Sequence, residues 1–310
     1  MDRRRFIQQT SLATGSVLAS GFGMEANSAK VPTRLVVLHT NDVHSRLEPF
    51  PLDGSRNAGL GGVASRAQVI QQIRKHNDLV LLLDAGDIFQ GTPYFNIYKG
   101  EPEIKAMTQM AYDACTIGNH DFDAGLENLA RQMGFAGFPM IVSNYDFTGT
   151  EMEGKTIPYH IIRKGPLKIG IYGIGIKLNG LVPENLYGKT TYQDPVQKAN
   201  EVADILKKKE KCDFVICLSH LGYKYGESNT ISDVLIAKEM QWTDLVIGGH
   251  THTFLDEPAV LKDKNGGDII VNQVGWAGVR LGRLDFSFEG VKKKNLLKAH
   301  SLIIGEKTTN

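Results

Sequence analysis

The chain has 310 residues, of which 42% are hydrophobic and 22% are charged, as in ordinary globular proteins. Its 35 basic and 34 acidic side chains leave a formal net charge of +1, which argues against a nucleic-acid scaffold with a strongly basic face. No uninterrupted apolar run approaches the roughly 20 residues that cross a bilayer, so the sequence predicts no transmembrane helix.

The first 29 residues are typical of an export signal. Arg4 and Arg5 precede the bulky apolar Phe6, a mildly apolar stretch follows at residues 11–23, and small residues near 26–29 offer a cleavage site. The arginine pair resembles a twin-arginine signal. We therefore expect a signal segment at residues 1–29, a folded domain at 30–310 and export to the periplasm. A basic tail that stays attached is the alternative.

Beyond the signal, short runs rich in valine, isoleucine and leucine alternate with longer mixed runs. Strands are expected at residues 34–38, 79–83, 114–117, 139–142, 167–174, 214–218, 245–247, 269–273 and 281–286. Helices are expected at residues 62–76, 103–112, 125–132, 195–209 and 228–240, with Pro195 and Ser228 as start signals. The alternation predicts one layered α/β domain with too many strands for a single sheet.

The chain has three cysteines, an odd number that argues against a complete disulfide framework. Cys115 and Cys217 lie in apolar, strand-like runs, which favours small buried thiols. One disulfide that forms after export is the alternative.

Five of the expected strands lead into short polar segments made of Asp, Asn and His. These segments are residues 39–44, 84–87, 118–123, 219–220 and 248–252. In α/β sheets, ligands bind beyond the carboxyl ends of the strands, so the five segments are expected to converge. Glycines at 86, 118, 248 and 249 would let the backbone turn beside the site. Each segment alone has an ordinary explanation as a turn, cap or structural histidine, but their joint occurrence predicts one site.

Nitrogen and oxygen donors without thiolate suit two divalent metal ions, of which Zn, Mn, Fe, Co and Ni are candidates, and argue against an iron–sulfur site. Two neighbouring ions need a shared ligand, and the carboxylate of Asp87 is the natural candidate. Two ions about 3.5–4 Å apart would clamp a phosphoryl group and hold an attacking hydroxide. The pattern therefore predicts metal-dependent phosphoric ester hydrolysis.

The order Asp-x-His, Gly-Asp, Gly-Asn-His, His and Gly-His-x-His resembles that of the calcineurin-like metallophosphoesterases. Within them, residues 38–48 (LHTNDVHSRLE), 84–87 (DAGD) and 118–123 (GNHDFD) look like the motifs of the 5′-nucleotidase and UDP-sugar hydrolase branch. The resemblance spans residues 34–286. It implies an α/β fold in the form of a four-layer α-β-β-α sandwich, with two mixed sheets flanked by helices.

The resemblance also implies a role for each matching residue. The metal ligands that it implies are Asp42, His44 and the more variable position His252 for the first ion, Asn119, His220 and His250 for the second, and Asp87 as the bridge. His120 would lie beside the leaving-group oxygen, where an imidazole can donate a proton, and Asp123 would hold its ring. A cap of the following helix is a further role open to Asp123.

These roles imply a 5′-nucleotidase-like phosphomonoesterase that uses in-line attack by a metal-bridging hydroxide. The alternatives are a cyclic-nucleotide phosphodiesterase, a nucleotide-sugar hydrolase or a sulfur-ester hydrolase. Full-length 5′-nucleotidases carry a second domain that binds the base, which this chain has no room for. We therefore expect either a separate partner chain that supplies this nucleotide-binding C-terminal domain or a different or broader phosphate-ester substrate. A further hypothesis, from a different functional class, is a metal-loaded subunit whose activity belongs to a complex.

Trp276 follows the expected strand at residues 269–273 and lies in a Gly-Trp-Ala-Gly segment. Such a residue either lies at the rim of the site or packs as an ordinary aromatic side chain. Ordinary packing is the simpler expectation.

Overall fold

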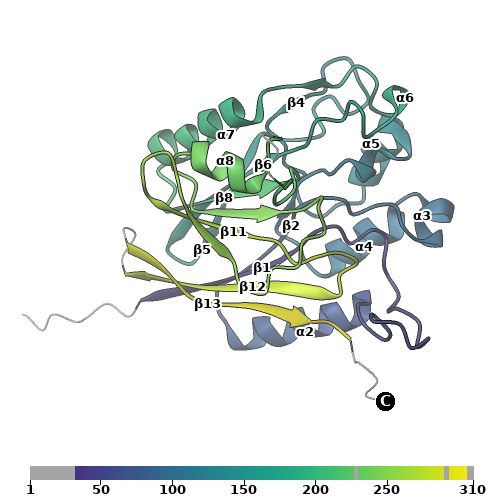
Figure 1. Cartoon of the computed structure of the whole chain (residues 1–310), viewed down its shortest axis with the longest axis horizontal. Helices are drawn as coiled ribbons and strands as arrows, with labels where there is room; N and C mark the ends of the chain where they lie inside the picture. The colour runs from purple at the N-terminus through teal and green to yellow at the C-terminus, as the bar shows by residue number, and fades with distance from the viewer. Residues whose placement is uncertain (1–31, 227–229, 290–292, 306–310) are drawn as a thin grey trace, which may run out of the picture. The chain divides into compact units, whose positions relative to one another are not determined.

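Two mixed β-sheets form the centre of the structure, a computed structural model that describes residues 32–226, 230–289 and 293–305 (Figure 1). The signal segment expected at residues 1–29 lies outside the described residues. The described residues contain no helix that is long and apolar enough to span a membrane.

The first sheet has five strands in the order β13-β12-β1-β2-β3. Their bounds are β1 (Thr33–Thr40), β2 (Val80–Asp84), β3 (Ala114–Cys115), β12 (Arg280–Glu289) and β13 (Lys293–Ile303). Strands β1, β2 and β3 are parallel, whereas β12 and β13 join antiparallel. The parallel strands therefore end at the same edge of the sheet.

The second sheet has six strands in the order β10-β11-β9-β8-β6-β5. Their bounds are β5 (Tyr159–Lys164), β6 (Leu167–Ile174), β8 (Phe214–Ser219), β9 (Leu245–Gly248), β10 (Ala259–Lys262) and β11 (Asp268–Asn272). The four inner strands are parallel and the two edge strands are antiparallel to their neighbours. A separate pair is formed by β4 (Tyr145–Asp146) and β7 (Thr191–Tyr192).

The alternation of side chains along the strands builds the layers. In β1, Leu35 and Val37 belong to the apolar core between the sheets, whereas Val36 and Leu38 belong to a core on the other face. Successive residues of a strand point to opposite faces, so a strand that is apolar throughout must be covered on both sides. Both sheets meet this requirement through helices on their outer faces.

Helices cover the first sheet on one side of the sandwich and the second sheet on the other. The first group is α2 (Val63–His76), α4 (Glu101–Gln109) and α5 (Gly125–Met133), and the second is α7 (Pro195–Asp204), the π-helical turn η2 (Ile205–Lys209) and α8 (Asp233–Glu239). Short helices α3 (Pro93–Tyr98), η1 (His120–Phe122) and α6 (Glu184–Tyr187) complete the described elements. The four-layer α-β-β-α arrangement implied by the resemblance is confirmed.

Some boundaries differ from the expectations. The strand expected at residues 139–142 is wrong, because Met140 and Ile141 form only isolated bridges. The helix expected at 228–240 covers only Asp233–Glu239, with Ser232 as its N-cap, and Ser228 lies outside the described residues. All three cysteines are buried and free, so the expected thiols are confirmed and the structure contains no disulfide among them.

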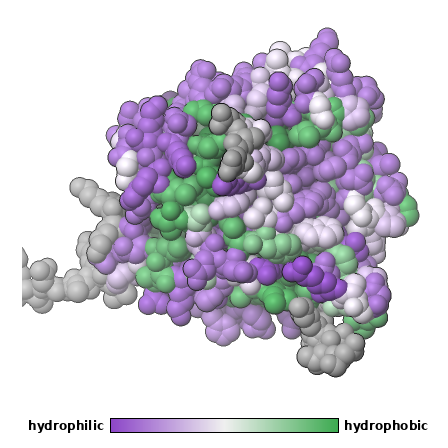
Figure 2. All heavy atoms as spheres, viewed as in Figure 1, coloured by the Kyte–Doolittle hydropathy of each residue, from purple (hydrophilic) through white to green (hydrophobic). Residues whose placement is uncertain are grey.

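The face seen in Figure 2 is mostly hydrophilic. Its hydrophobic residues gather in a band at the left of the view, over the edge of the six-stranded sheet (Figures 1 and 2). The exposed Val260 of edge strand β10 is one apolar residue of that edge.

Candidate metal centre

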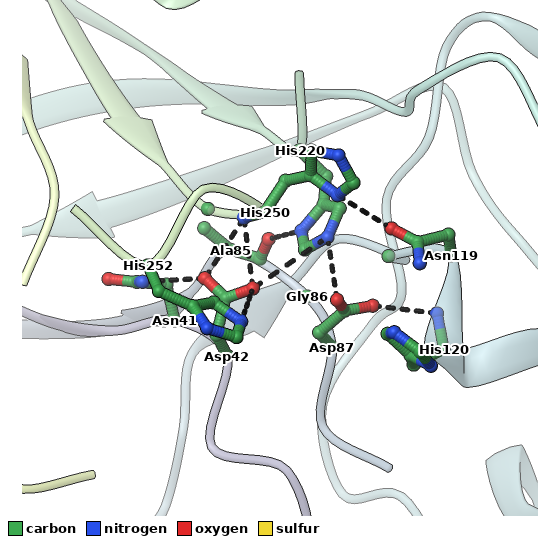
Figure 3. Close-up of polar contacts among 12 residues, drawn as sticks. Asn41, Asp42, Ala85, Gly86, Asp87, Asn119, His120, His220, His250 and His252 are labelled. Carbon is green, nitrogen blue, oxygen red and sulfur yellow. Dashed lines mark hydrogen bonds and ion pairs between the residues drawn. The ribbon is translucent and has the colours of Figure 1, made fainter. Parts of the chain in front are cut away.

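The five polar segments converge, because the strands that carry them end at one edge of the sandwich. Main-chain bonds join the first two segments: Asp42 donates to the carbonyl of Gly86 at 2.9 Å, and His44 donates to that of Asp87 at 3.1 Å. The segment after β9 reaches across from the second sheet, where the amide of His250 donates to the Asp42 carboxylate at 2.9 and 3.0 Å. Residues from both sheets thus line one site (Figure 3).

A first cluster consists of Asp42, His44 and His252, whose ligand atoms all lie within 4.8 Å of one another. Nε2 of His44 lies 2.9 Å from Nε2 of His252. Nδ1 of His44 lies 3.2 Å from the carbonyl of Phe89, which can only accept, so this nitrogen carries the ring proton. Nε2 of His44 therefore points a lone pair toward the other two side chains.

A second cluster consists of Asp87, His220 and His250, again within 4.8 Å. Nδ1 of His220 donates to the carbonyl of Ala85 at 2.6 Å, so Nε2 is the ring nitrogen that is available as a metal ligand. That Nε2 is buried without a hydrogen-bond partner, although it lies 3.1 Å from the Asp87 carboxylate. Asn119 adjoins this cluster, since its Oδ1 lies 2.8 Å from Nδ1 of His250 (Figure 3).

The donor set fits a pair of divalent cations. Nε2 of His220 faces the Asp87 carboxylate, and Nε2 of His44 faces Nε2 of His252. A positive charge between the two atoms would stabilise each of these pairs. Oδ2 of Asp87 lies 3.1 Å from Nε2 of His220 and 3.9 Å from Nε2 of His44. One carboxylate oxygen therefore reaches toward both clusters.

The electrostatics of the site also call for positive charge. Burial alone would lower the pKa of His220, but the carboxylates of Asp87 and Asp42 raise it to about 10. Burial would raise the pKa of Asp87, yet His220 and His44 hold it well below its usual range. Burial and His220 together lower the pKa of His250 to about 4, which keeps it in the neutral form that binds metals. A cation that binds here would displace the proton of His220.

The backbone is left-handed at most of these side chains. Such φ values are uncommon outside glycine, and the residue types most tolerant of them are Asn, Asp and His. The residues concerned are Asp42 (φ 50°), His44 (φ 51°), Asp87 (φ 54°), His250 (φ 73°) and His252 (φ 51°). Strained backbone of this kind clusters at functional sites and persists where the surrounding structure holds it.

Two of the four glycines in the predicted segments show why glycine is needed here. Gly86 has φ +87°, and a Cβ added to it would lie 2.6 Å from the amide of Gly118. At Gly118 a Cβ would lie 2.2 Å from Oδ1 of Asp87. The expected sharp turn is therefore present at Gly86, whereas Gly118 is required by the close approach of the Asp87 side chain.

Asp121 is a site residue to which sequence reasoning gave no role. Its buried carboxylate accepts four main-chain N–H bonds, which join the segments after β2 and β3. The donors are Asp87 at 3.1 Å, Ile88 at 2.9 Å, Phe89 at 3.1 Å and Gly118 at 2.8 Å. It therefore fixes the backbone on which Asp87 stands. Its place within the GNHDFD motif was the available signal.

Asn41 has a similar part in the first cluster. Its Nδ2 donates to Oδ2 of Asp42 and to the carbonyl of Gly275, each at 2.6 Å, and its Oδ1 accepts from the amide of Val274 at 3.0 Å. The side chain thus orients Asp42 and links it to the segment after β11. The motif around Asp42 contains Asn41, but spacing alone does not reveal these bonds.

His120 lies beside the two clusters, and its ring is oriented by Asp123. Nδ1 of His120 lies 2.8 Å from Oδ2 of Asp123, and this hydrogen bond raises the pKa of His120. The main-chain N–H of His120 donates to Oδ1 of Asp87 at 2.8 Å, which ties the histidine to the second cluster. The cap of α5 is Ala124 and no side-chain bond caps that helix, so Asp123 orients the ring rather than the helix.

Trp276 lies at the site rather than only in an apolar core. Its ring stacks on that of His252, with centroids 5.7 Å apart and an interplanar angle of 11°. It also meets Phe50 edge to face at 5.8 Å and packs against a small cluster with Leu60 and Val279. The expectation of ordinary packing is therefore incomplete, because one face of the ring supports a residue of the first cluster.

The sequence model of the calcineurin-like phosphoesterases matches residues 35–254. The chain therefore belongs to the calcineurin-like phosphoesterase family, and the resemblance expected from the motifs is confirmed. Together with the two clusters, this membership supports two divalent metal ions as cofactors.

The relatives carry the comparison further. A snake venom 5′-nucleotidase from Gloydius brevicauda is 34% identical over 285 residues, covering 86% of this chain and 47% of its own length. The crystal structure of a 5′-nucleotidase precursor from Thermus thermophilus has a TM-score of 0.79 at 31% identity, covering 88% of this chain and 55% of its own. A calcineurin-like phosphoesterase structure from Bacillus subtilis has a TM-score of 0.70 at 26% identity, with coverages of 89% and 91%. The chain thus spans about half the length of the curated relatives it matches.

Proposed function

We propose that this chain is a metal-dependent phosphoric ester hydrolase, and most specifically a 5′-nucleotidase-like phosphomonoesterase. The observation that carries the proposal is the pair of clusters that meet at Asp87. In the first cluster Nε2 of His44 faces Nε2 of His252, and in the second Nε2 of His220 faces the Asp87 carboxylate, each pair at hydrogen-bond distance. The Nδ1 atoms of His44 and His220 are held by main-chain carbonyls. This is the arrangement expected of a protein that holds two cations side by side.

In this proposal each cluster holds one ion. The first would be held by Asp42, His44 and His252, and the second by Asn119, His220 and His250, with Asp87 between them. When bound, the ions supply Lewis-acid charge to a phosphoryl group and lower the pKa of water at the site. Only two carboxylates, Asp42 and Asp87, belong to this set, so they neutralise two dications only in part. The site would therefore attract a phosphate anion and favour the charge that develops on it.

His120 is the proposed proton donor to the departing oxygen. Its Nδ1 is committed to Asp123, which leaves Nε2 to face a substrate. The carboxylate stabilises the imidazolium form, so a proton is held on the ring until charge develops on the leaving group. The side chain of His120 is 42% exposed, compared with 20% for Asp123, so the donor is accessible while its orienting partner is not.

The test is hydrolysis by the purified chain from Lys30 onward, loaded with manganese or zinc. It is measured as phosphate released from monoesters and as nucleoside monophosphate formed from the cyclic nucleotide and the nucleotide sugar. The panel is AMP, a cyclic nucleotide, a nucleotide sugar and an aryl phosphate, each with and without a chelator. Hydrolysis that a chelator abolishes supports the proposal, and the preferred substrate separates phosphomonoesterase from the phosphodiesterase and nucleotide-sugar alternatives. Metal-loaded chain that hydrolyses no member of the panel would contradict it.

We further propose that the substrate is a nucleotide and that a separate chain acts as a partner. The chain spans about half the length of the venom 5′-nucleotidase that it matches, and the partner in this proposal is a separate chain with a nucleotide-binding domain. Addition of such a partner would raise the preference for AMP over the aryl phosphate. A strong preference for AMP by the chain alone would show that no partner is needed.

Export through the twin-arginine route, to the periplasm, is the proposed location, with residues 1–29 as the signal and 30–310 as the catalytic domain. It is supported by the arginine pair, the weakly apolar stretch and the small residues that follow them. Replacement of Arg4 and Arg5 by lysine should leave the chain unprocessed inside the cell. Unchanged export of this variant would contradict the route.

A further inference from the structure

Two of the candidate ligand histidines are held by hydrogen bonds at Nδ1. Nδ1 of His44 lies 3.2 Å from a main-chain carbonyl, and Nδ1 of His220 donates to another at 2.6 Å. Such a bond fixes the plane of a ligand ring and the direction of its other nitrogen. His252 has no bond of this kind, because within the described residues the hydrogen-bond contact of its ring is that between Nε2 and His44. Its orientation therefore depends on a different kind of contact.

The His252 ring lies on the face of Trp276. The two rings are nearly parallel, with an interplanar angle of 11° and centroids 5.7 Å apart, which is the offset stacking that aromatic rings prefer. An imidazole that tilts away loses this contact, so the stack sets the plane of the ring. With the ring held in this plane, Nε2 lies 2.9 Å from Nε2 of His44 and 3.5 Å from the Asp42 carboxylate (Figure 3). The stack thus directs Nε2 into the first cluster.

The main chain around Trp276 is bonded to the first cluster on both sides. The amide of Ala277 donates to the carbonyl of Asp42 at 2.7 Å. The amide of Gly275 donates at 2.9 Å to the carbonyl of Thr253, the residue that follows the histidine. These two bonds fix the position of Trp276 relative to both segments that supply ligands to the first cluster.

The indole itself is held from the side. Its ring meets Phe50 edge to face, with centroids 5.8 Å apart, and the guanidinium of Arg46 lies 4.3 Å from the centroid of Phe50. The indole also packs in a small apolar cluster with the buried Leu60 and Val279. A ring held in this way is a fixed surface, whereas the side chain of His252 that rests on it is 39% exposed.

We propose that Trp276 is a positioning residue for the first metal position, and that its ring does for His252 what a hydrogen bond at Nδ1 does for His44. This inference rests on the proposed function, in which the first cluster holds an ion. It makes the metal affinity of that position depend on an aromatic ring at residue 276, while the second position does not depend on it. Residues that orient ligands contribute about 10–100-fold to metal affinity, so the effect is measurable.

The experiment measures manganese binding by calorimetry, without any substrate. Trp276→Leu removes the ring and keeps an apolar side chain, whereas Trp276→Phe keeps a smaller ring. Trp242→Leu is the matched control, because Trp242 is the other tryptophan of the chain, is 37% exposed and belongs to neither cluster. His252→Ala identifies the binding step that belongs to the first position. Circular dichroism and thermal unfolding of each purified variant report its folding.

We expect Trp276→Leu to weaken by about 10–100-fold the same step that His252→Ala weakens, and to leave the other step unchanged. Trp276→Phe should keep most of the affinity, and Trp242→Leu should keep all of it. The double variant of Trp276→Leu and His252→Ala should bind manganese no more weakly than His252→Ala alone, because no ring is left to orient. A role in packing alone would lower the unfolding temperature without this selective effect.

Three outcomes would overturn the positioning role. They are unchanged manganese binding by a folded Trp276→Leu, equal weakening of both steps in that variant, and a further loss of affinity in the double variant. Trp276→Phe tests the proposal even where Trp276→Leu does not fold, because an affinity as low as that of His252→Ala would show that a ring at this position does not orient the ligand.

The same measurements separate this inference from the proposed function. A first step that depends on the ring, in a chain that hydrolyses no ester, would support the positioning role and contradict the hydrolase. Ester hydrolysis by a chain whose manganese binding is unaffected by Trp276→Leu would do the reverse. A purified chain that binds no manganese would overturn both.

Discussion

The first and second clusters of the candidate centre are held in different ways. His252 of the first cluster stands on a loop and its side chain is 39% exposed, whereas His220 of the second is fully buried at the end of β8. His220 is fixed by a bond to the carbonyl of Ala85, while His252 is supported by the face of Trp276. One candidate metal position is therefore built into the sandwich, whereas the other is closed by an exposed side chain. We expect the second ion to be the more tightly held.

The largest effect is expected at Asp87, the residue that the two clusters share. Asp87→Ala removes the carboxylate that reaches toward both, so one or both ions and nearly all activity should be lost. Metal analysis of the purified variant and phosphate release measure the two effects. Asp268→Ala, which breaks an exposed ion pair with Lys262, is the control. Full activity of Asp87→Ala would end the assignment of a shared ligand.

A direct comparison of His220→Ala with His252→Ala comes next. Loss of the buried His220 leaves Asp87 facing an empty space, so the second ion should be absent from the purified variant. Loss of the exposed His252 leaves a place that water can fill, so the first ion should remain at raised metal concentration. Metal content after dialysis measures both. A variant at His252 that loses more metal than the one at His220 would reverse the comparison.

His120→Gln tests the site beyond the ions. The variant should keep both metals, because neither cluster includes the His120 ring, yet kcat should fall by about 10²–10⁴-fold, as expected for loss of a general acid. Metal analysis and steady-state kinetics with an aryl phosphate measure this. Unchanged kcat would remove His120 from the mechanism, and loss of metal would assign it a structural role instead.

Asp121→Asn should affect the second cluster more than the first. The amide group replaces one acceptor oxygen by a donor, so some of the four main-chain N–H groups lose their partner. The backbone under Asp87 would then shift, and metal affinity should fall by about 10–100-fold, as for other residues that orient ligands. A metal titration monitored by calorimetry measures this affinity. Equal weakening of both positions would show that Asp121 supports the whole edge.

The smallest effect is a shift of the pH dependence. The carboxylate of Asp123 raises the pKa of His120 because it stabilises the charged ring. A proton donor must be charged to act, so kcat should fall as pH rises through that pKa. Asp123→Asn lowers the pKa of His120, and the descending limb should therefore move to lower pH. The pH profile of kcat measures this, and an unshifted limb in Asp123→Asn would contradict the orienting role.

The fold was predictable where strands are buried on both faces. Residues 167–174 were expected as a strand and form β6 with those bounds, because no charged residue interrupts the buried run from Ile169 to Ile174. The missed strands β5, β10 and β13 all lie at sheet edges, where charged side chains are tolerated. Because β13 begins with lysines, a search for apolar runs does not detect this edge strand.

The site was predictable as far as its motifs reach. All seven candidate ligands lie together because each follows a recognisable strand. The bonds of Asp121 and Asn41 depend instead on which main-chain groups of other segments come near, and no spacing contains that information.

The left-handed backbone at five candidate ligands has a consequence for how this centre can change over evolution. Aspartate, asparagine and histidine are the side chains that tolerate such φ values best, and all three can bind metals through nitrogen or oxygen. A single exchange among them at residues 42, 44, 87, 250 or 252 would therefore alter the chemistry offered to the ions while the loop keeps its path. The preference for one metal over another can therefore change through single substitutions that leave the fold unchanged.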